Sequence, residues 1–344
     1  MVELLRVAEG GLFSSLQDEG RFGFQRFGIS ASGAMDAVAL RLANALVGNP
    51  PGTAAIETTL SGPDLVVEAE RCRIAVTGAE VPLAINGKPA ALWCAHDLVR
   101  GDRLTLGTAR RGLRAYVAVA GGFAVAPVLG SLSTHSRSRI GGLDGGPLRS
   151  GNSLPLRAPS GEGPCLGLDA AAVPDRAGPI RVVLGPQDEA FTPAGIATFL
   201  SARYAVSAKA DRMGYQLEGP VVAHAAGFNI VSDGIVHGSI QVPGHGRPVI
   251  LLADRQTTGG YPKIATVIGP DLFRLAQRRP GEEVRFVAVS AAEAEHLARS
   301  HESAVAAALR TVRAVPPSGG IVAERLLDSN LISGVISAIP EPPA

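Results

Sequence analysis

The sequence predicts a mainly β protein with a few helices, arranged as two related domains. The 42 glycines and 25 prolines make up nearly a fifth of the 344 residues, which is typical of many short strands joined by turns. Short apolar runs recur along most of the chain and seldom reach helical length. A chain of this length also exceeds what one core usually organises, since domains hold roughly 150 residues.

Turn signals separate the runs that we expect to be strands. Asn86-Gly87 favours a tight hairpin, because both central residues of that turn must accept a positive φ. We also expect a hairpin edge at Gly101-Asp102, between the apolar runs 98–99 and 104–106. The other expected strands are 65–67, 74–76, 116–120, 181–184, 230–232, 249–253, 265–268 and 284–289.

Helices are few, and each has a start signal. Asp36 can cap a helix over 37–47. Thr192-Pro193 and Pro270-Asp271 each open a short helix, since proline is favoured in the first turn. The longest helix begins at Ser290, where a glutamate three residues later completes a capping box.

Two internal echoes suggest a duplication. The pattern Arg-x-Gly-aromatic-Gln occurs at 21–25 and again at 212–216. A glycine turn followed by the start of a strand occurs three times, at 101–104, 151–154 and 281–284.

These echoes lead us to predict two β-rich domains over 1–157 and 180–312. The stretch 158–179 is rich in proline, glycine and alanine and is the expected linker. A C-terminal extension follows over 313–344. Its apolar positions in 326–336 either cover the chain's own core or form a strip for docking a partner.

Composition excludes several classes of function. The 32 basic and 31 acidic side chains leave a net charge of +1, so nothing favours nucleic-acid binding. The uncharged stretch 115–134 is interrupted by glycine and proline, and the N-terminus is charged. We therefore expect no membrane span and a cytoplasmic protein. Three cysteines without a Cys-x-x-Cys pair predict neither a disulfide framework nor a metal site.

The first candidate site is the segment 17–36. It sets an arginine, hydroxyls and amides among glycines, which suits an anion or carboxylate cradle. An ordinary turn followed by a capped helix is the alternative. The candidate residues here are Arg21, Gln25, Ser32, Gly33 and Asp36.

The second candidate site is the segment 233–263. Its glycine turn can present backbone amides to a phosphate or an oxyanion, and a lysine can add a point charge. A solvated surface turn is the alternative. The candidate residues here are Gln241, Asp254, Gln256, Thr257, Thr258, Gly259, Gly260, Tyr261 and Lys263.

Three further residues give weaker signals. Glu57 is either a carboxylate of raised pKa or a salt-bridge partner at a strand edge. His135 can act as a base for a neighbouring hydroxyl. His237 and His245 lack the spacing of a usual zinc pair.

Nucleotide and biotin motifs are missing from the sequence. It contains no P-loop, so ATP would be handled through partners or an unfamiliar site. No lysine lies beside a methionine, as it does around a biotin-carrying lysine, so we expect no covalent biotin on this chain.

At the two clusters the chain resembles the carboxyltransferase subdomain A/B family, the group called allophanate hydrolase subunit 2, KipA or the 5-oxoprolinase C subunit. The resemblance covers about residues 3–338. The strings that carry it are Gln17-Asp18-Glu19-Gly20-Arg21, Ser32-Gly33-Ala34-Met35-Asp36, Gln241-Val242-Pro243 and Gln256-Thr257-Thr258-Gly259-Gly260-Tyr261-Pro262.

The resemblance implies two cyclophilin-like β-barrel domains related by internal duplication. It also implies a hydrolase subunit of an ATP-dependent 5-oxoprolinase complex, which opens 5-oxoproline to glutamate. The expected partners are a KipI-like protein, which is the 5-oxoprolinase B subunit, and a third subunit. The expected substrate is a small amide or lactam. The alternatives are a carboxyltransferase subunit of a biotin-dependent urea carboxylase and a non-catalytic KipA-like regulator.

Both chemistries place developing charge on an oxygen that needs prearranged donors. The amides near Gly259, with Tyr261 and Lys263, are the expected donors. Arg21 would grip a substrate carboxylate, and Asp254 or Asp36 would manage protons. This prediction requires that Arg21 and Tyr261 share one hollow.

Overall fold

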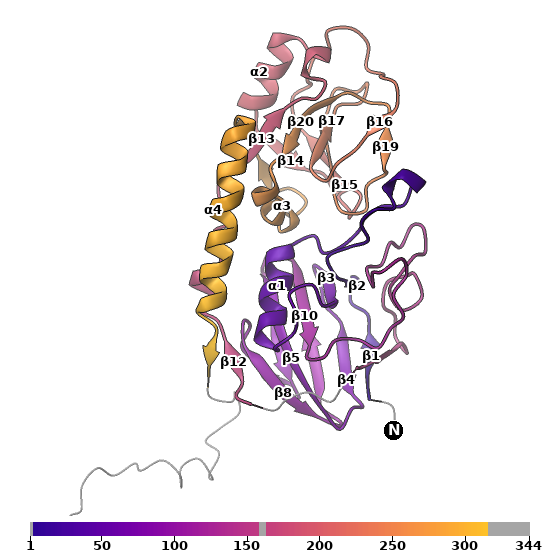
Figure 1. Cartoon of the computed structure of the whole chain (residues 1–344), viewed down its shortest axis with the longest axis vertical. Helices are drawn as coiled ribbons and strands as arrows, with labels where there is room; N and C mark the ends of the chain where they lie inside the picture. The colour runs from indigo at the N-terminus through magenta and orange to yellow at the C-terminus, as the bar shows by residue number, and fades with distance from the viewer. Residues whose placement is uncertain (1–2, 158–162, 316–344) are drawn as a thin grey trace, which may run out of the picture.

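Two β-rich halves lie end to end in the computed structural model, which describes residues 3–157 and 163–315 (Figure 1). The long helix α4 runs alongside both halves and packs against α1 of the first and α3 of the second. The predicted mainly β architecture with a few helices is confirmed. The α-helices of the described residues are α1 (Ala37–Leu46), α2 (Pro193–Ser201), α3 (Gly269–Ala276) and α4 (Ala291–Arg310), and the 3-10 helices are η1 (Gln25–Phe27), η2 (Ala170–Ala172) and η3 (Asp188–Ala190).

The first half is built from two stacked antiparallel sheets. Their strands run in the orders β11-β1-β4-β9-β6-β7 and β2-β3-β10-β5-β8. Consecutive strands repeatedly pass from one sheet to the other, which gives a flattened barrel. The strands are β1 (Leu4–Glu9), β2 (Phe13–Gln17), β3 (Ala55–Thr59), β4 (Asp64–Val67), β5 (Arg71–Glu80), β6 (Leu83–Ile85), β7 (Lys88–Pro89), β8 (Ala95–Val99), β9 (Arg103–Leu106), β10 (Arg111–Val119) and β11 (Ser153–Pro155).

The second half is one eight-stranded sheet that nearly closes into a barrel. Its order is β21-β14-β15-β18-β17-β20-β13-β22, so β21 and β22 lie at opposite ends. Only Arg285 separates these two strands in the sequence, and the sheet must therefore curl until its edges meet. The strands are β13 (Ile180–Leu184), β14 (Tyr204–Val206), β15 (Gly214–Glu218), β17 (Ser239–Gln241), β18 (Val249–Leu251), β20 (Lys263–Val267), β21 (Glu283–Val284) and β22 (Phe286–Ala288).

Two short ladders complete the fold. β12 (Leu166–Gly167) pairs with β23 (Arg313–Ala314), so part of the expected linker is tied to the segment after α4. β16 (Asp233–Gly234) pairs with β19 (Thr258–Gly259) at the edge of the second half.

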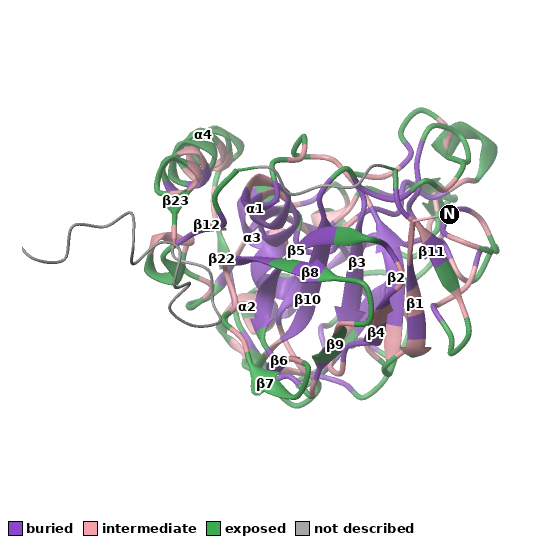
Figure 2. Cartoon of the chain, turned by 90° about the horizontal axis from the view of Figure 1, so that it is seen from below, coloured by how far each residue is buried: buried purple, intermediate pink, exposed green. Residues whose placement is uncertain are grey.

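Three apolar clusters hold these elements together. One fills the space between the two sheets of the first half, and another fills the barrel of the second. The third joins the halves: it contains α1, Tyr116 of β10, Phe273 of α3, and Val305 and Ala308 of α4. Seen along the long axis, the buried residues gather on the sheets and on the inner face of α1 (Figure 2).

The predicted helix starts are confirmed. Asp36 accepts a hydrogen bond from the Ala39 amide, and Thr192 accepts one from the Gly195 amide. Ser290 caps the 20-residue α4 in the same way. Side-chain oxygens satisfy amides that the first helical turn leaves without partners, which explains why these short-range signals suffice.

The two echoes have different outcomes. In each copy of the turn-and-strand echo the glycine has a positive φ and a strand begins two residues later, at Arg103, Ser153 and Glu283. The other echo is wrong as a structural repeat. Its first copy, 21–25, is a loop that leads into η1, whereas its second, 212–216, enters β15.

Other strand predictions are corrected by pairing. The Asn86-Gly87 hairpin forms, with both residues at positive φ. The Gly101-Asp102 hairpin does not, because β8 pairs with β5 while β9 pairs with β4 and β6 of the other sheet. The run 230–232 is not a strand.

The sheets of the two halves fall within the ranges expected for the two domains. We retain 1–157 and 180–312 as proposed domains and 158–179 as the proposed linker. Of the C-terminal extension, residues 316–344, including the apolar positions 326–336, lie outside the described residues. No helix in the described ranges is long and apolar enough to cross a membrane.

Candidate functional site

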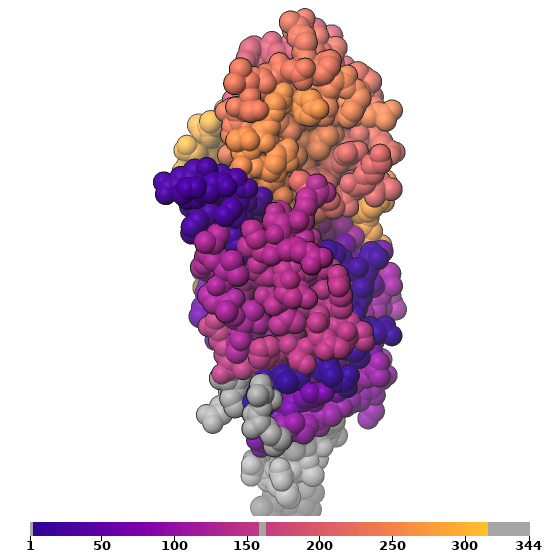
Figure 3. Space-filling view, turned by 90° about the vertical axis from the view of Figure 1, so that its right-hand side faces the viewer, coloured from indigo at the N-terminus to yellow at the C-terminus, as the bar shows by residue number. Residues whose placement is uncertain are grey.

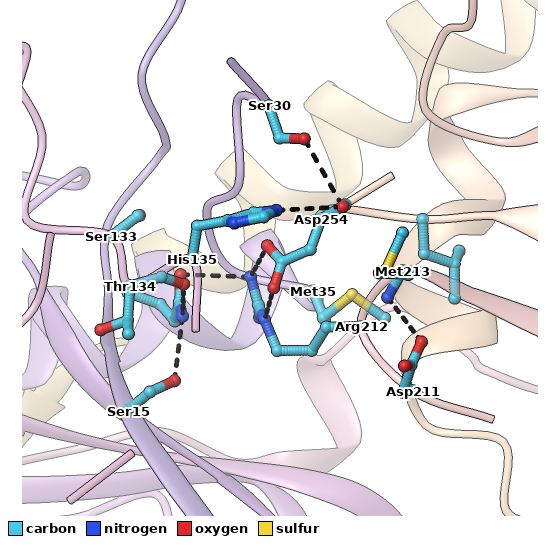
Figure 4. Close-up of polar contacts among 12 residues, drawn as sticks. Ser15, Ser30, Met35, Ser133, Thr134, His135, Asp211, Arg212, Met213 and Asp254 are labelled. Carbon is cyan, nitrogen blue, oxygen red and sulfur yellow. Dashed lines mark hydrogen bonds and ion pairs between the residues drawn. The ribbon is translucent and has the colours of Figure 1, made fainter. Parts of the chain in front are cut away.

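A buried arginine marks the junction of the two halves. Arg212 precedes β15, and its guanidinium faces the carboxylate of Asp254 (Figure 4). The Nε atom donates to Oδ2 and the Nη2 atom to Oδ1, both at 2.9 Å. This two-point contact fixes the plane of the guanidinium as well as its position.

The same guanidinium reaches into the first half. Arg212 donates to the backbone oxygen of Gly33 at 2.7 Å, to Oε1 of Gln17 at 3.2 Å and to the carboxylate of Glu57. Burial opposes its charge, but the carboxylates of Asp254 and Glu57 outweigh burial and raise the pKa of Arg212. One side chain therefore joins both halves as a permanent cation.

Glu57 lies on β3, inside the five-stranded sheet, and acts as a salt-bridge partner rather than a free carboxylate. Its Oε2 accepts hydrogen bonds from the Met35 amide at 2.8 Å and from the Tyr116 hydroxyl at 2.6 Å. Burial, together with the charges of Glu57 and Asp36, holds the pKa of the Tyr116 hydroxyl well above its usual value. Tyr116 therefore serves as a neutral donor to Glu57.

Two histidines lie near Asp254. His135 donates from Nε2 to the backbone oxygen of Asp254 at 3.2 Å and accepts from the Ser138 amide at Nδ1. Both ring nitrogens are thus engaged, which disfavours the expected role of His135 as a base. Burial, reinforced by the charges of Arg255 and Arg212, lowers the pKa of His237 to about 3, so this second ring is neutral.

A cavity of about 760 Å³ opens beside Arg212 and Asp254. Both halves line it: Leu60 and Arg114 come from the first, and Ala210 from the second. Arg137 lies at this cavity, is exposed, and has no ion-pair partner among the described residues. The volume is in the range of small-molecule sites, and the lining mixes apolar groups with four arginines and two aspartates. We call this space the first cavity.

Some predicted residues of the first candidate site, the segment 17–36, are buried, and others are exposed at the surface. Arg21 is buried, donates to the backbone oxygen of Ser133, and does not line the first cavity. Burial lowers its pKa, while Asp18 and Asp254 oppose the shift. Gln25 is exposed on η1.

Ser32 and Gly33 form a strained turn against the centre. Both have a positive φ, 56° for Ser32 and 93° for Gly33. The hydroxyl of Ser32 is buried and has no hydrogen-bond partner within the described ranges, whereas the backbone oxygen of Gly33 accepts from Arg212. A non-glycine residue in this conformation costs about 1–3 kcal/mol, and such strain often lies at functional sites.

Asp36 has three structural partners. Beyond capping α1, its carboxylate accepts from Arg176 at 3.0 Å and from Gln277 at 2.7 Å. These donors occupy both oxygens, so the structure gives Asp36 a role in joining α1, α3 and the segment before β13. Its predicted role in proton transfer stays a prediction.

The predicted residues of the second candidate site, the segment 233–263, include a polar group in the second half that is separate from the first cavity. Lys263 is buried on β20, and its Nζ contacts Asp233 at 2.5 Å and the backbone oxygen of Gly234 at 2.9 Å. Gln241 donates to the backbone oxygen of Tyr261 at 3.2 Å, while the tyrosine ring is exposed. Neither Lys263 nor Tyr261 lines the first cavity.

The glycine turn of this cluster is partly a strand. Thr258 and Gly259 form β19 and pair with β16, rather than presenting an open cradle of amides. The backbone oxygens of Thr257 and Gly260 accept from Ile235 and Ile230. A Cβ on Gly259 would lie 2.6 Å from the Gln241 amide, which explains the glycine there. Gln256 is exposed.

The two clusters therefore meet at Asp254 and not at Tyr261. Ser30 donates to the backbone oxygens of Asp254 and Arg255, and Gly33 contacts Arg212. In surface view, the indigo N-terminal segment lies at the level where the magenta first half meets the orange second half (Figure 3). Arg21 contacts the backbone oxygen of Ser133, whereas the backbone oxygen of Tyr261 accepts from Gln241, and the hollow expected to be shared by Arg21 and Tyr261 stays a prediction.

Sequence reasoning missed the central arginine. Arg212 stands out in the sequence only in the 212–216 echo and, with Gly214, among the matches to the family, and its role depends on partners up to 195 residues away in the chain. Arg137 is easier to single out from the sequence, because it is the first arginine after the long uncharged stretch 115–134. Within the described residues, no group of three or more histidine, cysteine or acidic side chains is placed to hold a metal ion.

Comparison with known proteins defines the class. The family described as carboxyltransferase domain, subdomain A and B, matches residues 27–288. The chain belongs to this family, and the matched range contains Arg212, Glu57 and Asp254.

Among its relatives is the 5-oxoprolinase C subunit of Escherichia coli, which is 38% identical over 296 residues, 85% of this chain and 93% of the relative. The Haemophilus influenzae protein of that name is 37% identical over 308 residues, 88% of this chain and 96% of that relative. The crystal structure of K. lactis urea amidolyase superposes with a TM-score of 0.82 at 30% identity, covering 88% of this chain and 20% of that chain.

Proposed function

We propose that this chain is the counterpart of the C subunit in an ATP-dependent 5-oxoprolinase complex, in which 5-oxoproline, ATP and water give glutamate, ADP and phosphate. The proposed partners are a KipI-like protein as the B subunit and a third subunit. The observation that carries the proposal is the identity of 37–38% to two proteins named as 5-oxoprolinase C subunits, over nearly the full length of each.

The first cavity is the proposed substrate site. 5-Oxoproline is a small ring that carries one carboxylate, and it matches a lining of apolar side chains in which four arginines outnumber two aspartates. Arg137, which has no ion-pair partner among the described residues, is the proposed carboxylate ligand in place of Arg21. A planar guanidinium suits this task because it can hold both carboxylate oxygens.

The buried centre behind the cavity supplies a fixed electrostatic environment. Lactam opening places negative charge on an oxygen, and donors that are already oriented stabilise such charge best. Arg114 lines the cavity, donates to Thr59 at 3.4 Å and lies 3.8 Å from Glu57. We propose that Arg114 and Arg212 stabilise this charge and that Asp254 orients Arg212.

Of the residues predicted as catalytic, Asp254 fits this site best. Tyr261 and Lys263 belong to the separate polar group of the second half, and we propose that they act at a surface completed by a partner subunit. The ATP requirement is assigned to the complex, and the reaction proposed here needs no nucleotide on this chain.

A second candidate function is carboxyl transfer in a biotin-dependent urea carboxylase. It is favoured by the superposition on K. lactis urea amidolyase and by 32% identity to the urea amidolyase of Lachancea kluyveri, over 87% of this chain and 18% of that relative. In that case carboxybiotin would arrive on another chain, and urea would occupy the first cavity.

Reconstitution tests the proposal. The full chain is mixed with the two proposed partner subunits, and glutamate is measured with 5-oxoproline in the presence and absence of ATP. ATP-dependent glutamate that requires all three chains supports the proposal. Urea-dependent consumption of carboxybiotin without glutamate formation would replace it with the second function.

Arg137 tests the location of the site. We expect Arg137→Ala to raise the KM for 5-oxoproline at least tenfold, because a charge-assisted contact contributes about 1.5–3 kcal/mol. Arg100→Ala is the matched control, since Arg100 is also an exposed arginine and does not line the first cavity. An unchanged KM in both variants would show that Arg137 does not bind the substrate carboxylate.

A further inference from the structure

A second cavity, of about 680 Å³, lies at another part of the junction between the halves. The ends of β5 and β10 form one wall, the segment 170–177 forms another, and the end of α3 with the residues that follow closes it. The side chains of interest in its lining are Trp93, Arg110, Arg111, Arg176, Arg274 and Arg278.

This second cavity has an excess of positive charge. Five arginines line it, against three acidic residues, Glu80, Asp175 and Glu282. Arg110 and Arg111 are exposed, and their side chains have no ion-pair partner among the described residues. Several arginines around one concave space concentrate positive potential there and attract a multiply charged anion.

The deeper arginines are only partly compensated by the protein. Arg274 is 7% exposed and pairs with Asp271 at 3.1 Å, and Arg176 pairs with Asp36 at 3.0 Å. Yet the Nε atoms of Arg176, Arg274 and Arg278 are buried without an acceptor in the part of the chain that the structure describes. Buried cationic groups with unmet hydrogen bonds are costly, and a nearby anion would offset part of that cost.

An apolar side completes the lining. Leu92, Trp93, Val173 and Pro174 face the same space as the arginines. Trp93 has a positive φ of 60°, a strained conformation that is held by hydrogen bonds of its backbone to Val76 and Leu168, both at 2.9 Å. The Trp93 side chain lines the cavity, and an aromatic ring at such a position can stack with a planar ring of a ligand.

We propose that this second cavity binds a nucleoside polyphosphate, with its phosphates among the arginines and its base on the side of Trp93. A cavity of this size suits a ligand with one charged and one ring-shaped part. Inorganic polyphosphate would satisfy the arginines but would leave the apolar side unused.

The bound nucleotide would lie across β10 from the first cavity. Gly112 lines the second cavity, whereas the next two residues, Leu113 and Arg114, line the first. Gln277 lines the second cavity and holds this part of β10, accepting from the Leu113 and Arg114 amides at 2.9 and 3.0 Å. The inference does not depend on the proposed function, because binding requires neither partner subunits nor 5-oxoproline.

The experiment uses the single tryptophan of the chain as a local probe. The purified full chain is titrated with ATP, ADP and inorganic triphosphate, while Trp93 fluorescence and the heat of binding are recorded. We expect saturable binding of ATP by both readouts, weaker at higher salt. Inorganic triphosphate should bind at least tenfold more weakly.

Two variants locate the binding. Arg110→Ala/Arg111→Ala should weaken ATP binding at least tenfold. Both side chains are exposed, so the variant should keep its fold, and circular dichroism of the variant checks this. Arg137→Ala, in the first cavity, is the control and should leave the affinity unchanged. The inference is overturned if calorimetry finds no saturable ATP binding, or if Arg137→Ala alone removes it. Equal binding of inorganic triphosphate would overturn the assignment to a nucleoside.

These outcomes separate the inference from the proposed function. Glutamate formation by the three-chain complex depends on the first cavity and is scored independently of nucleotide binding to this chain alone. A complex that makes glutamate while the isolated chain ignores ATP would overturn the inference and leave the proposed function standing.

Discussion

At the scale of single residues, Arg212 concentrates the contacts between the halves. Two buried carboxylates, Asp254 and Glu57, depend on its charge. A buried ion pair is weak grounds for high stability, since replacing all partners by apolar groups can be neutral. Removing one partner alone is different, because it leaves uncompensated charge in the interior.

We therefore expect Arg212→Met to lower the free energy of unfolding by about 3–5 kcal/mol. Arg212→Lys keeps the charge but loses the planar fork that meets Asp254 at two points, and it should cost less. Urea denaturation of the two variants and of the surface variant Arg100→Met measures these differences. A loss below about 1 kcal/mol for Arg212→Met would contradict the central role of this residue.

His237 makes stability depend on pH. Its folded-state pKa of about 3 lies below the ordinary value of 6.5, so the folded protein holds this ring neutral. The unfolded chain binds a proton as the pH falls below about 6.5, and the folded state is therefore destabilised from there down to about pH 3. Arg255 and Arg212 disfavour the imidazolium, and Asp254 opposes them only in part.

The expected result is a flatter acid limb in His237→Gln. Between about pH 6.5 and pH 4.5, the stability of the variant relative to the parent should rise by about 1–2 kcal/mol, since one proton contributes at most about 1.4 kcal/mol per pH unit. Thermal unfolding at several pH values measures it. His245→Gln, at an exposed histidine, is the control; equal pH profiles for both variants would show that His237 is not held neutral.

At the scale of elements, two helix caps of the same kind differ in what else they hold. Ser290 is exposed and caps α4 only. Asp36 caps α1 and also binds Arg176 and Gln277 from inside the structure. The same local signal therefore has a structural meaning that the sequence around it does not reveal.

We expect Ser290→Ala to cost about 1 kcal/mol, the usual effect of losing a cap. Asp36→Ala should cost about 3 kcal/mol or more, because it also leaves Arg176 and Gln277 without their acceptor. Chemical denaturation of the two variants gives the comparison. Similar small losses would mean that Asp36 is a cap and nothing more.

The local features predicted correctly from the sequence, such as helix starts and tight turns, are those that a few neighbouring residues determine. Helix caps, the Asn86-Gly87 turn and the three glycine turns before strands all depend on backbone preferences within about five residues. The Gly101-Asp102 hairpin failed because strand pairing is decided by distant segments: β8 and β9 find partners in different sheets. Local pattern cannot separate a hairpin from a crossing between sheets.

The candidate site was predictable only in part, for the same reason. Asp254 and Glu57 stood out as acidic residues in apolar or glycine-rich surroundings, and the structure brings both to Arg212. Lys263 lies in the predicted segment 233–263 beside Asp233, but it lines neither the first cavity nor the second, and its role in a site stays a prediction. Which cluster meets which depends on how the halves dock, and docking leaves no short-range pattern.

At the scale of the whole molecule, one amide side chain that lines the second cavity joins the two halves. Gln277, just after α3, accepts from the Leu113 and Arg114 amides and donates to Asp36 at 2.7 Å and to the Arg114 backbone oxygen at 2.9 Å. All four contacts cross from the second half to the first. A buried amide with every contact met fixes the docking geometry more strictly than apolar packing does.

Replacing this side chain should therefore loosen the coupling between the halves as well as lower stability. Gln277→Met keeps the volume but leaves two backbone amides of β10 buried without acceptors, at a cost of about 1–3 kcal/mol each. Trp93 fluorescence reports unfolding of the first half, while circular dichroism reports both halves. We expect the two urea transitions to coincide in the parent chain and to separate in Gln277→Met, because two-state unfolding requires the halves to unfold together.

Gln25→Met, at an exposed glutamine, is the control and should leave the two transitions coincident. Coincident transitions with an unchanged midpoint in Gln277→Met would mean that the apolar cluster of α1, α3 and α4 alone holds the halves together.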